Sequence, residues 1–160
     1  KIPIYADLIT KKSLTNTFGY CFKDYKNYPS ILDAKILKNK HILNDINSII
    51  IIKSFKVHHG SIKSICYIIN DKCAYAPDVN YIDSKDLRYL KNLKYFIIDC
   101  LRYNYHPTHF NLDDVLKLIR KVKPQKTILT NLSNEIDYNE IKKKLPKNVI
   151  PAHDGLTVLI

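Results

Sequence analysis

The chain has 160 residues, of which 46% are hydrophobic and 26% are charged, and its formal net charge is +11. This length and this apolar content suffice for one hydrophobic core, so they predict a single domain over residues 1–160. No apolar run approaches the roughly 18 to 20 residues of a membrane-spanning helix, which excludes a membrane partner, and no leader-like segment begins the chain. The cytoplasm is therefore the expected location.

The positive charge bears on the kind of partner that the protein binds. A charge of +11 fits a nucleic-acid partner, but the lysines are scattered along the chain, and a bias toward Lys, Ile and Asn explains the charge equally well. Nucleic acid is therefore allowed as a partner without being favoured.

The four cysteines form no CxxC pair and lie in apolar surroundings, which indicates buried, reduced thiols rather than disulfides or a zinc knuckle.

The first half of the chain begins with strand and helix signals and then becomes rich in strands. Residues 2–5 predict a short strand, Asp7 can cap a helix that runs toward Phe18, and Gly19 provides the stop. The next segments alternate or are β-branched and apolar, so they predict successive strands of one sheet. These strands are expected at residues 35–43, 46–57, 62–70 and 73–76, with a tight turn at Asn70-Asp71 between the last two.

The second half of the chain alternates helices with buried strands, which is a βαβ-like rhythm. Ser84 can cap a short helix, and Asn111 and Asp114 are spaced like a capping box at the start of a longer one. The longer helix carries an apolar stripe of Leu112, Val115, Leu116, Ile119 and Val122. Strands are expected at residues 95–100, 126–129 and 156–160, and a last helix at residues 138–145.

Polar side chains stand at the ends of two of the predicted strands. His58 and His59 precede Gly60 at one strand end, and Asp78 follows Pro77 at another. An imidazole and a carboxylate that converge from strand ends form a pair that divalent cations favour. Taken one at a time, His59 fits an ordinary strand-end histidine and Asp78 a residue of a turn, so other motifs must decide.

A loop between a predicted strand and the capped helix contains two more histidines, His106 and His109, among polar and aromatic residues. Such loops commonly carry functional residues. His109 also fits a residue that caps or packs against the helix that follows it. The loop therefore adds candidates for a site without fixing their roles.

The order of these motifs resembles the metallo-β-lactamase superfamily, most of all the branch that includes phosphoribosyl 1,2-cyclic phosphate phosphodiesterase. The motifs that carry the resemblance are His59-Gly60, Ala76-Pro77-Asp78, Asp99, His106-Pro107-Thr108-His109-Phe110, Thr130-Asn131 and Pro151-Ala152-His153-Asp154-Gly155. The resemblance implies an α/β fold, the α/β-β/α sandwich, which binds one or two divalent metals, zinc or manganese, at the sheet edges.

The resemblance also implies roles for four residues. His59 is a metal ligand, and Asp78 is the carboxylate that bridges the metals. His109 is the catalytic histidine that acts on the scissile phosphate, where an imidazole protonates the leaving oxygen or neutralises its charge. His106 is a neighbour with a structural or substrate-binding role. The resemblance makes His59 rather than His58 the ligand candidate, since His59 precedes Gly60 as the family's ligand does and alternate residues of a strand face opposite sides.

Two departures from the superfamily pattern affect the expected metal site. The motif HisXaaHisXaaAspHis, which would precede the strand that begins at Ile2, does not occur in this chain, and Thr130-Asn131 stands where the family has a last ligand histidine. We therefore expect this chain to correspond to the C-terminal portion of the domain and to bind metal weakly alone. An upstream portion of the same fold, or a second copy of the chain, is the expected partner that completes the sandwich.

The sequence thus predicts a metal-dependent hydrolase, a phosphodiesterase that acts on a small cyclic phosphate or a related phosphate ester. An RNA-processing nuclease of the same superfamily is an alternative that the charge favours and the scattered lysines do not. A non-catalytic remnant or binding domain is a further alternative, and the missing ligands favour it for this chain taken alone.

Overall fold

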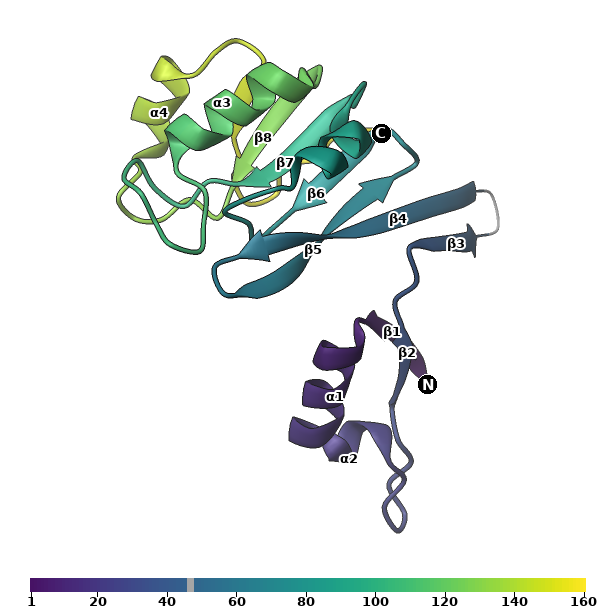
Figure 1. The fold of residues 1–160 in the computed structure, drawn as a ribbon. Coiled ribbons are helices and arrows are strands. Elements are labelled where there is room, and N and C mark those ends of the chain that lie inside the picture. Colours follow the sequence, from purple (N-terminus) through teal and green to yellow (C-terminus); the bar gives the residue numbers. More distant parts are fainter. Residues whose placement is uncertain (46–47) are drawn as a thin grey trace. The chain divides into compact units, whose positions relative to one another are not determined.

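The structure, a computed structural model, describes residues 1–45 and 48–160 and divides into two compact units, Lys1–His41 and Ile42–Ile160 (Figure 1). The first two residues of the strand expected at 46–57 lie outside these described ranges. The expectation of one domain over residues 1–160 stays a prediction, and each unit is described by itself below.

The smaller unit is built around two parallel strands that are joined by helices. Its elements are β1 (Ile2–Ala6), α1 (Leu8–Thr17), α2 (Gly19–Phe22) and β2 (Leu32–Ile36). The predicted cap of the first helix is confirmed, because Asp7 Oδ1 accepts a hydrogen bond from the Thr10 N–H at 2.8 Å. The helix ends at Thr17, but Gly19 is the first residue of α2 rather than a left-handed stop.

Apart from the first two residues of β3, the larger unit contains a seven-stranded sheet in the order β3-β4-β5-β6-β7-β8-β9. Its strands are β3 (Lys40–Asp45), β4 (Ser48–His59), β5 (Ile62–Ile69), β6 (Cys73–Ala76), β7 (Tyr95–Asp99), β8 (Lys126–Thr130) and β9 (Val149–Pro151). The β4-β5 and β5-β6 pairs are antiparallel, whereas β6 to β9 run parallel to one another. The carboxyl ends of β4, β6, β7 and β8 therefore lie at one edge of the sheet.

The tight turn predicted between β5 and β6 is confirmed. Asn70 and Asp71 both adopt left-handed backbone conformations, with φ of 52° and 55°. Two successive residues of this kind make the turn whose twist matches that of two antiparallel strands, and Asn and Asp tolerate it better than most residues.

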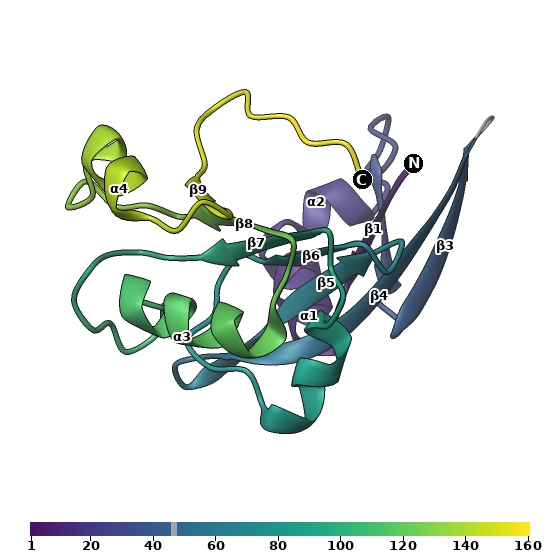
Figure 2. The same cartoon turned by 90° about the horizontal axis from the view of Figure 1, so that it is seen from above.

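Helices and the sheet enclose the core of the larger unit. The helices are the 3₁₀ helix η1 (Ser84–Leu90), α3 (Leu112–Val122) and α4 (Tyr138–Lys144), and Figure 2 shows η1 and α3 on the same side of the sheet. Asn111 caps α3 as predicted, since its Oδ1 accepts from the Asp114 N–H at 2.9 Å, but the Asp114 carboxylate accepts from the Asn111 side-chain amide at 3.0 Å rather than from its backbone N–H. Val115 and Ile119 of the apolar stripe are buried in a cluster that includes Phe96 and Ile98 of β7.

The strand predicted over residues 35–43 is wrong as a single element. Its first part belongs to β2 and its last part to β3, which pair in two different sheets. Between them, the Lys38 N–H donates a hydrogen bond to Nε2 of His41 at 2.7 Å. A side chain that bonds the backbone three residues away closes a turn, so the alternating pattern is interrupted there.

Two further predictions of local structure are corrected. The last strand, predicted over residues 156–160, is absent: this segment has no strand, and Leu159 is 80% exposed. The predicted helix after Ser84 is a 3₁₀ helix whose first flanking residue is Asp83, which makes no side-chain capping bond.

The cysteines agree with the prediction of reduced thiols. All four cysteines are free thiols, and three of them are buried. Burial raises the pKa of the Cys66 thiol and raises that of Cys100 to about 12, so both stay protonated near neutral pH.

Among the helices in residues 1–45 and 48–160, none has the length and apolar character needed to cross a membrane.

Candidate metal centre

Three side chains with metal-binding atoms meet at the edge where the strands end. His59 is the last residue of β4, Asp78 lies two residues beyond the end of β6, and His109 lies in the loop between β7 and α3. One ligand atom of each residue lies within 4.8 Å of the other two. The sheet topology explains this meeting, because residues that follow the carboxyl ends of neighbouring strands share one edge.

The imidazole of His59 is oriented by the backbone of the loop before α3. Its Nδ1 lies 2.7 Å from the carbonyl oxygen of Thr108. A carbonyl oxygen only accepts hydrogen bonds, so Nδ1 carries the proton and donates it. The other ring nitrogen, Nε2, therefore keeps its lone pair, as a metal-ligating histidine requires.

The imidazole of His109 is paired with a buried carboxylate. Its Nδ1 lies 2.6 Å from Oδ2 of Asp99, which also accepts a hydrogen bond from the Val79 N–H at 3.1 Å. Asp99 is fully buried, and its burial raises the pKa of the carboxyl against the opposing effect of these two bonds. Its Oδ1 has no hydrogen-bond partner in the described part of the chain. Such a carboxylate fixes the orientation of a histidine ring and balances the charge of an imidazolium.

Asp78 is held by the residue that follows β8. The side-chain amide of Asn131 donates to the carbonyl oxygen of Pro77 at 2.6 Å and lies 3.5 Å from Oδ1 of Asp78. The hydroxyl of Ser64 donates to the backbone carbonyl of Asp78. Asn131, which stands where the family pattern predicts a ligand histidine, thus lies against the carboxylate of the cluster.

The remaining two histidines of the predicted region differ in their distance from the cluster. The ring of His106 lies 5.1 Å from that of His109, centroid to centroid, and burial together with the nearby Arg102 lowers its pKa. His58 faces elsewhere: its Nε2 lies 3.1 Å from Oδ1 of Asp83, and its ring contacts Tyr81. The structure therefore brings His59, Asp78, His109 and His106 together and separates His58 from them.

Two polar residues that have no role in the family motifs support the cluster. Asp99 could have been identified from the sequence, because an aspartate that ends an apolar strand must find a partner once it is buried. Asn80 could not, because an asparagine after a Pro-Asp turn fits an ordinary surface residue. Its amide nevertheless bonds both the Gly60 N–H and the Pro107 carbonyl oxygen, at 3.0 and 2.8 Å.

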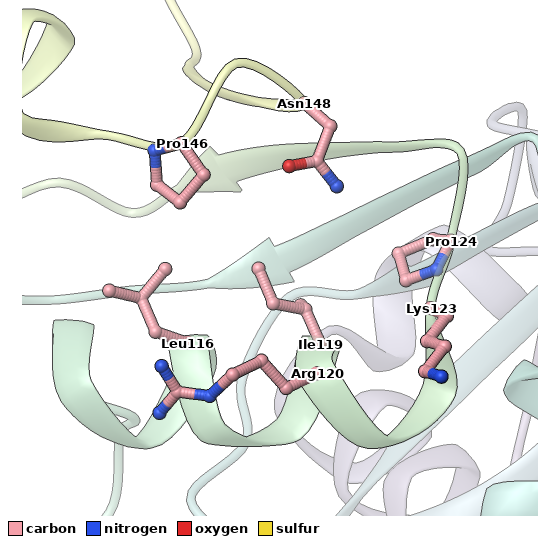
Figure 3. A pocket seen from close by; sticks show the side chains of 7 residues that line it. All are labelled: Leu116, Ile119, Arg120, Lys123, Pro124, Pro146 and Asn148. Carbon is pink, nitrogen blue, oxygen red and sulfur yellow. The ribbon is translucent and has the colours of Figure 1, made fainter.

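A pocket between α3 and the segment before β9 is separate from the cluster. Figure 3 shows it lined by Leu116, Ile119, Arg120, Lys123, Pro124, Pro146 and Asn148. None of these residues belongs to the histidine and aspartate cluster. The pocket therefore does not bear on the chemistry at the strand ends.

The donor atoms of the cluster fit a divalent cation. Two imidazoles with their proton on Nδ1 present Nε2 atoms, and the third donor is a carboxylate, a combination that zinc and manganese accept. His59 and Asp78, with or without His109, are the residues that would hold such an ion.

The fold and this cluster agree with a comparison of the sequence against family models. The model described as Beta-lactamase superfamily domain matches residues 1–130, so the chain belongs to this family. The metallo-β-lactamase fold implied by the motifs is confirmed. No curated protein matches the chain.

Solved structures with the same fold cover almost all of this chain. A diphosphatase from the PhnP family has 25% identity and a TM-score of 0.84, and the match covers 99% of this chain and 58% of that one. Zinc-bound PqqB from Methylobacterium extorquens has 11% identity and a TM-score of 0.74, with 99% and 64% covered. The short form of human tRNase Z has 13% identity and a TM-score of 0.67, with 99% and 67% covered. The chain thus spans about three fifths of the length of the diphosphatase.

Proposed function

We propose that His59 and Asp78 bind a divalent cation beside His109 and that the site hydrolyses a small phosphodiester, such as a cyclic phosphate or a related phosphate ester. The observation that carries this proposal is the meeting of the three side chains within 4.8 Å, with His109 paired to a buried carboxylate. The family to which the chain belongs and the likeness to a diphosphatase at 25% identity support it.

In this proposal His59 and Asp78 hold the ion, which is zinc or manganese. When bound, a divalent cation polarises a phosphoryl oxygen and lowers the pKa of a water molecule beside it. His59 contributes its Nε2 lone pair because Thr108 O fixes the proton on Nδ1. Asp78 contributes a negative charge that is oriented by the amide of Asn131.

His109 is the catalytic imidazole of the proposal. Hydrolysis of a phosphodiester breaks a P–O bond, and the leaving oxygen needs a proton. Nε2 of His109 donates that proton, while Nδ1–H stays bonded to Asp99, whose carboxylate balances the imidazolium charge. His106 lies beside this ring and is proposed to contact the substrate.

RNA is a second candidate substrate. The chain carries 26 Lys and Arg residues against 15 Asp and Glu, and a tRNase Z shares its fold. Lys and Arg side chains that bind RNA phosphates release condensed counterions, and this release is less favourable at higher salt. RNA affinity should therefore fall steeply with salt concentration. We also propose a cytoplasmic location and a partner that completes the sandwich. That partner is an upstream portion of the same fold or a second copy of the chain.

Hydrolysis of bis-p-nitrophenyl phosphate tests the proposed activity. We expect release of p-nitrophenol that depends on added Zn²⁺ or Mn²⁺, disappears with a chelator, and is lost in His109→Ala. The matched control is His153→Ala, because His153 is an exposed histidine whose ring contacts Tyr138 and lies outside the cluster. Absence of metal-dependent turnover both in this chain and in a version extended by the upstream portion would contradict the proposal. Single-stranded RNA, assayed at two salt concentrations, is the competing substrate.

A further inference from the structure

The orientation of His59 depends on the position of a loop. The bond from its Nδ1–H to Thr108 O, at 2.7 Å, decides both the direction of the ring and the nitrogen that carries the proton. If Thr108 moved away, the proton would be free to occupy Nε2, and the lone pair that faces Asp78 and His109 would be lost. His59 therefore keeps its metal-binding tautomer and ring direction only while this loop stays in place.

The loop itself has little regular structure to hold it. Residues 103–110 form neither helix nor strand, and Pro107 has no backbone N–H with which to bond a neighbour. Contacts from other segments must fix the loop against the end of β4. The loop lies very near Gly60, where an added Cβ would lie only 2.6 Å from Cγ2 of Thr108.

One side-chain amide joins the two segments at this place. Oδ1 of Asn80 accepts from the Gly60 N–H at 3.0 Å, and its Nδ2 donates to the Pro107 carbonyl oxygen at 2.8 Å. Asn80 is itself fixed, because its backbone N–H donates to His58 O at 2.9 Å. The amide oxygen thus binds the turn directly after His59, and the amide nitrogen binds the loop at the residue directly before Thr108.

We propose that Asn80 is a positioning residue that sets the tautomer and direction of His59 by holding the loop of residues 107–109 against the turn at Gly60. The same contact places His109, two residues beyond Pro107, on the side of the cluster. The inference rests on the proposed metal site, and it assigns control of that site to a residue that binds no metal.

Two measurements on Asn80→Ala test this role. The Zn²⁺ affinity, from competition with a chromophoric chelator, should fall about 10-fold, as it does when a residue that orients a ligating histidine is removed. In the metal-free protein, long-range ¹H–¹⁵N NMR should show His59 mainly as the Nδ1–H tautomer in the wild type and as a mixture in the variant. Asn80→Ser, whose short hydroxyl cannot span both partners, should give the same two changes with a smaller effect on folding.

Asn70→Ala is the matched control. Asn70 also accepts a backbone hydrogen bond through its side chain, from the Ile51 N–H at 2.8 Å, but it follows the far end of β5. The eight residues of β5, at about 3.3 Å each, separate it from the cluster by roughly 25 Å. This variant should lose thermal stability while keeping the Zn²⁺ affinity and the His59 tautomer of the wild type.

Unchanged affinity and an unchanged tautomer in both Asn80 variants would overturn the inference, and so would an equal loss of affinity in Asn70→Ala. If the wild-type chain bound no Zn²⁺, the proposed function would fail. The tautomer of His59 in the metal-free protein would still decide whether Asn80 positions it.

Discussion

Replacing Asp78 by asparagine is expected to lower the affinity for Zn²⁺ or Mn²⁺ by more than about 100-fold, because even residues behind metal ligands contribute 10- to 100-fold. The substitution keeps the size of the side chain and one oxygen atom, but it removes the only negative charge among the three converging donors. Metal-dependent hydrolysis should be lost together with the ion.

Asp71→Asn is the matched control for this substitution. Asp71 also follows a strand of the same sheet, but its carboxylate pairs with Lys53 Nζ at 2.6 Å on the exposed surface. Exposed pairs of this kind contribute about 0 to 1 kcal/mol, so the control should fold and bind metal like the wild type. Calorimetric titration with each ion measures both variants. Wild-type affinity in Asp78→Asn would remove Asp78 from the site.

Replacing Asp99 by asparagine is expected to reduce hydrolysis by about 10²- to 10⁴-fold, the range that general acid–base groups contribute. Oδ2 of Asp99 accepts from both the Val79 N–H and Nδ1 of His109, so an asparagine oxygen in its place can keep both bonds. The side chain then carries no charge that could stabilise a His109 imidazolium. A neutral imidazole without a carboxylate behind it is a poor proton donor.

The same variant separates the two roles open to His109. If His109 is the proton donor, the Zn²⁺ affinity of Asp99→Asn should stay within a few-fold of that of the wild type while the rate falls. If His109 is a third ligand, loss of the carboxylate behind its ring makes Nε2 a weaker donor, and the affinity should fall 10-fold or more. Parallel measurements of rate, affinity and thermal unfolding distinguish these results from a loss of folding.

Patterns that depend on neighbours in the chain predicted the fold well. The capped helix α3, the turn at Asn70 and Asp71 and the strands on either side of it follow from capping residues, turn residues and alternating burial, all of which act over a few residues. The split of residues 35–43 between two sheets could not be predicted, because the pattern of a strand does not say which partner it pairs with.

The candidate site was predictable in its main residues because they end strands. His59 and Asp78 follow apolar segments, and the topology then places those ends at one edge. The contacts that orient these residues join parts of the chain 20 to 54 residues apart, such as Asn80 with Gly60 and Asn131 with Pro77. Such contacts leave no periodic signal in the sequence, so only the structure shows them.

The central claim is that His59, Asp78 and their neighbours form a metal site in this chain, and metal titration of the purified 160-residue protein tests it most directly. The account predicts saturable binding of Zn²⁺ or Mn²⁺ that is abolished in His59→Ala and preserved in His153→Ala. Absence of saturable binding, or equal binding by the wild type and His59→Ala, would contradict it.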